Sequence, residues 1–168
     1  MNRRRWMQLS LASAVALSLG GGLLVAMEPG WQRAGFSRGA TSVWQALGRA
    51  FLDGALPTEP AARDVALQGL VERLHVAVLA LPEHAQHELS QLLMLLSTAV
   101  GRRTLAGLST DWPQASIPEL HAALQDMRSS RVSLRVQSYL ALHDLVGVAY
   151  FSDPSTWTVL DYPGPLVI

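Results

Sequence analysis

From residue 41 onward, apolar side chains recur at intervals of three and four residues, the spacing that places them along one face of an α-helix. No run of four to eight residues alternates cleanly between apolar and polar side chains, as a half-buried strand would. The clearest stripe consists of Leu67, Leu70, Val71, Leu74, Val78 and Leu81. The pattern therefore predicts an all-α fold, a single bundle of about five helices within residues 41–168.

Capping residues and prolines indicate where these helices begin. Thr41 or Ser42 can cap the first helix, and Pro60 suits the first turn of the second helix, where proline is tolerated. Ser116 and Glu119 have the spacing of a capping box, in which each side chain accepts a hydrogen bond from the backbone N–H of the other residue. We therefore expect helices to begin near these positions.

The third expected helix contains the most apolar stretch of the bundle. Its run from Leu92 to Leu96 carries apolar side chains on every side of the helix. Because a helix that is apolar all round is usually buried, we expect this helix to be the central one.

Length and composition exclude several classes of protein. A chain of 168 residues is enough for one compact domain and too short for two ordinary ones. The absence of cysteine excludes disulfides, cysteine-bound zinc and iron–sulfur clusters. A formal net charge of +0 gives no general attraction to nucleic acid, so we expect no nucleic-acid partner.

The first 26 residues have the features of an export signal. Arg3, Arg4 and Arg5 precede the bulky apolar pair Trp6 and Met7, and the stretch that follows to residue 26 carries no charge. A cationic block before an uncharged apolar region is typical of a signal peptide. Residues 27–40 are rich in glycine, arginine and polar side chains, and we interpret them as a linker to the bundle.

The order of these residues resembles a twin-arginine signal. That resemblance rests on Arg3, Arg4, Trp6 and Met7 and on an apolar region that is only mildly hydrophobic. It implies that the twin-arginine translocase carries the chain, already folded, to the periplasm. A plain secretory signal or an uncleaved membrane anchor is the alternative, because the uncharged stretch is close to the minimum length of a membrane span.

The sequence contains no recognisable catalytic constellation. His84 and His87 have helical spacing that suits two metal ligands, but a metal site needs a third ligand from elsewhere, and a solvated helix start explains them equally well. The chain has no G-x-S-x-G motif and no phosphate-binding loop. We therefore predict no catalytic residue, no metal site and no cofactor in this chain.

Arginines and aromatic residues are the candidates for a partner interface, because stable interfaces concentrate these side chains. The alternative is that the arginines form ordinary ion pairs with Asp111 or Asp126 and that the aromatic residues pack against the bundle. The tail, residues 152–168, contains prolines that cannot continue a helix, so it lies over the bundle or contacts a partner. The candidates are Trp112, Arg128, Arg131, Arg135, Trp157, Tyr162, Pro163 and Pro165.

Several segments together resemble one protein family. The leader, the small helical body, the segment from Gly101 to Trp112 and the ending from Tyr150 to Pro165 are similar to the small subunits of bacterial flavin-dependent periplasmic dehydrogenases, of the gluconate 2-dehydrogenase type.

The resemblance implies a non-catalytic accessory subunit. Such a subunit binds a large flavoprotein of the glucose–methanol–choline type, which carries the FAD and has no signal of its own, and takes it across the membrane folded. Electrons then leave through a separate cytochrome subunit. The alternative is a free-standing or membrane-anchored envelope protein that binds other partners without an enzyme.

Overall fold

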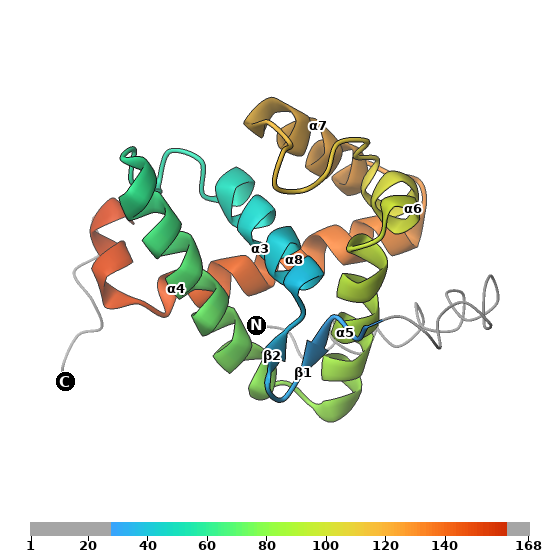
Figure 1. Cartoon of the computed structure of the whole chain (residues 1–168), viewed down its shortest axis with the longest axis horizontal. Coiled ribbons are helices and arrows are strands. Elements are labelled where there is room, and N and C mark those ends of the chain that lie inside the picture. Colours follow the sequence, from blue (N-terminus) through green and yellow to red (C-terminus); the bar gives the residue numbers. More distant parts are fainter. Residues whose placement is uncertain (1–27, 161–168) are drawn as a thin grey trace.

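Helices account for most of residues 28–160, the part of the chain that the computed structural model describes (Figure 1). The prediction of an all-α fold is confirmed, with one short hairpin in addition. The leader and residues 161–168, with Tyr162, Pro163 and Pro165, lie outside the described residues. In order, the elements are β1 (Trp31–Gln32), β2 (Gly35–Phe36), α3 (Arg38–Phe51), α4 (Pro60–Leu79), α5 (Glu83–Leu96), α6 (Ala99–Gly101), the π-helical turn η3 (Arg102–Ala106), α7 (Ile117–Arg128), α8 (Ser133–Phe151) and the 3-10 helix η4 (Pro154–Leu160).

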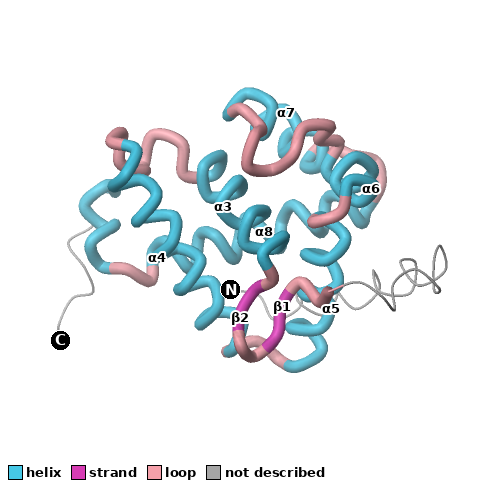
Figure 2. The backbone as a smooth tube through the Cα atoms, in the orientation of Figure 1, coloured by secondary structure: helices cyan, strands magenta, loops and turns pink. Residues whose placement is uncertain are grey.

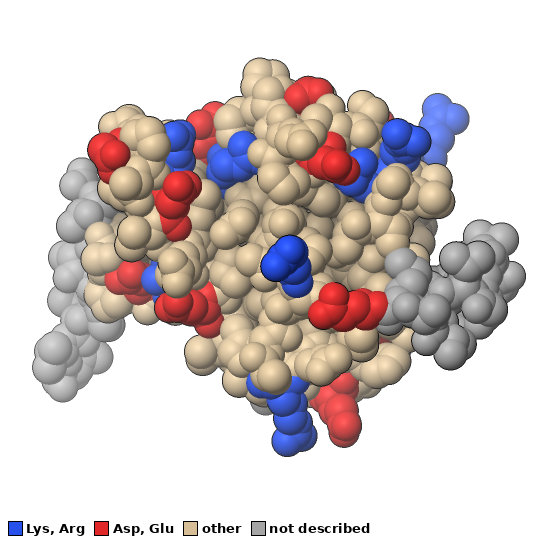
Figure 3. Space-filling model, in the orientation of Figure 1, with Lys and Arg blue, Asp and Glu red and all other residues tan. Residues whose placement is uncertain are grey.

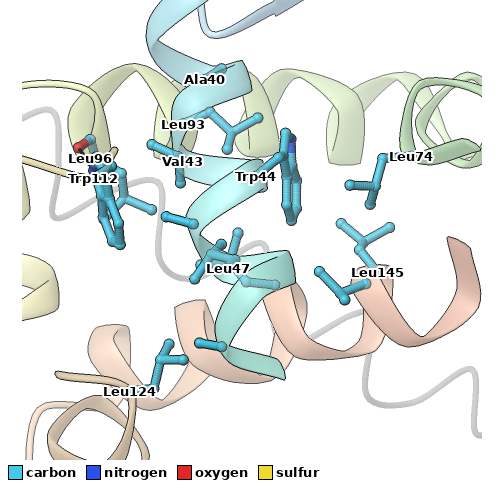
Figure 4. Close-up of a cluster of buried hydrophobic side chains, with 14 of the residues drawn as sticks. Ala40, Val43, Trp44, Leu47, Leu74, Leu93, Leu96, Trp112, Leu124 and Leu145 are labelled. Atoms are coloured by element: carbon cyan, nitrogen blue, oxygen red, sulfur yellow. Dashed lines mark hydrogen bonds between the residues drawn. The ribbon is translucent and has the colours of Figure 1, made fainter. Parts of the chain in front are cut away.

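The centre of the bundle is α3, which contacts α4, α5, α7 and α8. Figure 4 shows its side chains Trp44 and Leu47 among Leu74 of α4, Leu93 of α5 and Leu145 of α8. All five are buried. The expectation that the third predicted helix is central is therefore wrong. That helix, α5, uses Leu93 for the core and lies at the side, because its run of leucines covers the hairpin as well as α3.

The helix starts agree with the sequence at two places and differ at one. Pro60 begins α4, preceded by Glu59, whose carboxylate accepts from the first free N–H groups of the helix. The capping box of Ser116 and Glu119 at α7 is also confirmed. The first helix begins earlier than expected, at Arg38, because the side chain of Ser37 accepts a hydrogen bond from the backbone N–H of Ala40.

The segment expected to be a linker is packed on the bundle from Trp31 onward. The strands β1 and β2 pair in antiparallel fashion and lie against the lower ends of α4 and α5 (Figure 2). The backbone N–H of Trp31 donates to Ser90 Oγ at 3.0 Å, and that hydroxyl donates back to the Trp31 carbonyl oxygen at 2.9 Å. The Trp31 indole donates to His75 Nδ1 at 3.1 Å. A buried tryptophan with three hydrogen bonds is an anchor, and composition alone does not predict it.

No helix within residues 28–160 is both long enough and apolar enough to cross a membrane.

Candidate interaction surface

Trp112 is part of the core and is therefore not offered to a partner. Its side chain is 4% exposed, and its indole Nε1 donates to the carbonyl oxygen of Leu96 at 2.8 Å. On the other side, Arg49 donates to the Trp112 carbonyl oxygen at 2.9 Å. The expectation that Trp112 lies in an interface is wrong because the loop before α7 folds this ring back onto the end of α5.

The arginines at the joint between α7 and α8 do not act as one group. Arg135 is half-buried and pairs with Asp126 at 2.7 Å, while its Nε donates to the Leu105 carbonyl oxygen at 2.8 Å. Arg128 and Arg131 are exposed, and Arg128 donates to Gln125. The ion-pair interpretation therefore holds for Arg135, and the other two remain available at the surface.

A second arginine pairs with the other expected carboxylate. The side chain of Arg102 is 7% exposed, in the turn η3, and it forms an ion pair with Asp111, which is mostly exposed. Its Nε has no hydrogen-bond partner within the described residues. A buried guanidinium without an ion pair costs free energy. The ion pair between Arg102 and Asp111 is therefore favoured, and it holds the irregular segment between α6 and α7 in place.

The C-terminal end of α8 is fastened to α4 and to η4. Arg73 of α4 donates to the Ala149 carbonyl oxygen at 2.9 Å and pairs with Asp153 at 3.2 Å. Hydrogen bonds from Ser155 lower the pKa of the Asp153 carboxyl, with a smaller contribution from the charge of Arg73. Trp157 is half-buried and its indole donates to the Phe151 carbonyl oxygen at 2.8 Å. This aromatic candidate therefore packs on the bundle through its N–H edge.

Two helices that pack on each other, α4 and α8, each leave apolar side chains in solvent. On α4 these residues lie on the side opposite the buried stripe of Leu67, Leu70, Leu74 and Val78. Exposed apolar side chains commonly mark interaction sites where they gather. The exposed residues lie on the outer face of each helix, and we call these two faces together the α4–α8 apolar surface; it consists of Val65, Val76 and Leu79 on α4 and Leu140, Val148 and Phe151 on α8.

Sequence reasoning missed this surface because both helices are apolar on more than one side. On α4 the spacing of Leu67, Leu70 and Leu74 predicts the buried face. The same pattern does not show that the other apolar residues form a second, exposed face. Val65 and Val76, which are 70% and 66% exposed, lie eleven positions apart, a spacing that returns to the same face after three turns. A second stripe at that spacing was the available signal.

His84 and His87 are the two histidines whose spacing suits a pair of metal ligands. His84 and His87 are both exposed in the first turns of α5. Within residues 28–160, no three side chains of histidine, cysteine, aspartate or glutamate are grouped so that they could hold a metal ion. Both imidazoles therefore lie in solvent at the start of α5.

Comparison of this chain with protein-family models, with curated proteins and with solved structures finds no match.

Proposed function

We propose that this chain is a non-catalytic accessory subunit that escorts a flavin-dependent dehydrogenase through twin-arginine export and stabilises it. The observation that carries the proposal is the α4–α8 apolar surface on a well-packed helical body. The leader with Arg3 and Arg4 supports the export route. FAD belongs to the partner, and electrons pass from there to a cytochrome subunit.

The chemistry of the surface fits a lasting complex better than a brief encounter. Phe151 and Val148 lie on either side of Ala149, whose carbonyl oxygen is held by Arg73, so their backbone is fixed before any partner arrives. Interfaces that persist have apolar, preformed centres, and rigid side chains lose less conformational entropy on binding. An escort that must hold its partner during translocation needs such an interface.

The test is co-purification of the chain from its native host with an affinity tag. We expect a large protein with the visible absorbance of bound flavin to co-elute in a fixed ratio to the tagged chain. The variants Val76→Asp and Phe151→Asp are expected to lose the flavoprotein. The matched control is Val100→Asp on α6, whose side chain is 73% exposed; α6 lies at the right of Figure 1, and α4 lies at the left. Circular dichroism on each variant verifies that the fold is retained.

The proposal fails if the wild-type chain elutes alone while the flavoprotein is present in the same extract. Recovery of the chain in the membrane fraction without a flavoprotein supports the alternative, an anchored envelope interaction protein. Equal loss of the flavoprotein in Val100→Asp contradicts the placement of the interface on α4 and α8.

A further inference from the structure

An open cleft lies between the C-terminal half of α3, the loop that follows it, the first turns of α4 and the residues leading into α7. Its volume is about 880 Å³, within the range of small-molecule sites. Basic and acidic side chains gather over the N-terminal end of α4 and the C-terminal end of α3 in Figure 3. The residues of the cleft that carry the argument are Arg49, Arg63, Asp53, Asp64, Gln45 and Gln68.

Two arginines face this cleft, and neither forms an ion pair among the described residues. Arg49, in the last turn of α3, is fixed by its hydrogen bond to the Trp112 carbonyl oxygen. Burial lowers the pKa of Arg49, and the nearby charge of Arg63 lowers it further. Both guanidinium groups line the same cleft, and their positive charges repel each other. A bound anion between them would relieve that repulsion.

Carboxylates line or adjoin the cleft, and within residues 28–160 none of them forms an ion pair with Arg49 or Arg63. Glu59, which feels the charge of Arg63, is engaged by the backbone N–H groups of Ala61 and Ala62. Asp53 lies 3.9 Å from the imidazole of His121. Asp64 lines the cleft and is exposed. The cleft therefore combines two unpaired cations with acidic and amide side chains that can accept or donate hydrogen bonds to the rest of a ligand.

We propose that this cleft binds a small organic anion whose carboxylate or phosphate group lies between Arg49 and Arg63. A guanidinium presents its N–H donors in a planar fork that matches both of these groups. The fixed position of Arg49 provides one side of the site before the ligand arrives. Arg63, at the first turn of α4, provides the other. This site is separate from the α4–α8 apolar surface and does not depend on the accessory role.

The test is titration of the full chain with succinate and with inorganic phosphate, each against sodium chloride of equal ionic strength. Backbone amide shifts by NMR report the location of binding, and calorimetry reports its affinity. We expect one of the two anions to shift the amides of residues 45–68 selectively. If only succinate shifts these amides, the ligand is a carboxylate. If only phosphate shifts them, the ligand is a phosphorylated compound.

Two substitutions are expected to move the affinity in opposite directions. Arg63→Gln removes a cation that forms no ion pair within residues 28–160, so the fold is retained and binding weakens about tenfold or more. Asp64→Asn removes a negative charge from the cleft, so binding of the same anion strengthens. Arg103→Gln, an exposed arginine on η3, is the matched control and leaves the affinity unchanged.

The proposal is overturned if neither anion shifts these amides more than sodium chloride does. It is equally overturned if Arg63→Gln binds the anion as tightly as the wild type, or if Arg103→Gln weakens binding to the same extent. Neither result bears on co-purification with a flavoprotein.

Discussion

The indole Nε1 of Trp112 donates a 2.8 Å hydrogen bond to the carbonyl oxygen of Leu96, which ties the loop before α7 to the last turn of α5. Carbonyl groups in the last turn of a helix lack partners within the helix, so a side-chain donor is valuable there. The same side chain belongs to the buried hydrophobic core (Figure 4). Trp112 therefore has both a polar and an apolar role.

These two roles are separable by substitution. Trp112→Phe keeps most of the ring and removes the donor, so we expect the free energy of unfolding to fall by about 1–3 kcal/mol. Trp112→Ala also leaves a cavity, and we expect a loss of about 3–5 kcal/mol. Urea denaturation followed by circular dichroism measures both. Equal losses for the two variants would contradict the role of the hydrogen bond.

The capping box at α7 predicts a specific dependence on pH. Hydrogen bonds from the side chain and backbone of Ser116, and one from Thr110, lower the pKa of Glu119 below its ordinary value. Its contribution to stability is therefore complete above the pKa of the unfolded chain and is lost as the pH falls through the lower pKa of the folded chain. Glu119→Gln is expected to be less stable than the wild type at neutral pH and to approach it in acid.

The measurement is urea denaturation of both proteins across the acid range. Other carboxylates with lowered pKa, those of Glu59 and Asp153, also titrate there, so only the difference between wild type and variant is informative. Glu72→Gln on the exposed side of α4 is the control. The difference in free energy of unfolding between this variant and the wild type should not change with pH in this way. If the difference in free energy of unfolding between the wild type and Glu119→Gln stays constant with pH, the capping box does not stabilise α7 as predicted.

Two helical glycines provide a matched pair. A Cβ on Gly101 would overlap the carbonyl group of Leu95, whereas a Cβ on Gly147 meets nothing within 4 Å. Gly101→Ala is expected to lower the free energy of unfolding by about 3 kcal/mol, because backbone must shift. Gly147→Ala is expected to raise it by about 0.5–1 kcal/mol through helix propensity. Thermal unfolding of the two variants compares them directly, and the prediction fails if both shift the midpoint in the same direction.

The helix α8 begins without a side-chain cap. Val132 occupies its N-cap position with extended backbone, and its exposed apolar side chain has no atom that can accept a hydrogen bond from the helix. Val132→Asp supplies an acceptor for the first free N–H groups, so we expect stabilisation of about 1 kcal/mol. Val132→Asn, which caps without charge, should give most of that gain. Unchanged unfolding midpoints for both variants would show that the first backbone N–H groups of α8 gain nothing from a side-chain cap because they already donate to water.

Local signals in the sequence predicted the elements well where a side chain acts on its own helix. The starts at Pro60 and at Ser116 depend on residues within one turn, so the sequence contains all the information needed. The same reasoning missed the cap at Ser37, since Thr41 and Ser42 have equal intrinsic preference and the choice depends on where the hairpin before them ends.

Long-range placement was beyond such signals. Trp112 is buried against Leu96, which is 16 residues away, whereas Trp157 is partly exposed and contacts Phe151, which is 6 residues away; helical spacing predicts neither pair. Apolar spacing also could not decide between α3 and α5 as the central helix, because both carry a strong stripe and only the assembled bundle gives α3 four helical neighbours.

Trp31 is fixed to α4 and α5 only a few positions after the region that resembles an export leader. Only a few residues therefore separate the end of that region from Trp31, the first residue fixed to the helices. A peptidase that cuts near residue 26 would have to bind the chain within a few residues of the folded helices. The depth of its active site, as well as the residues at the cleavage site, would therefore determine which peptide bond it can cleave.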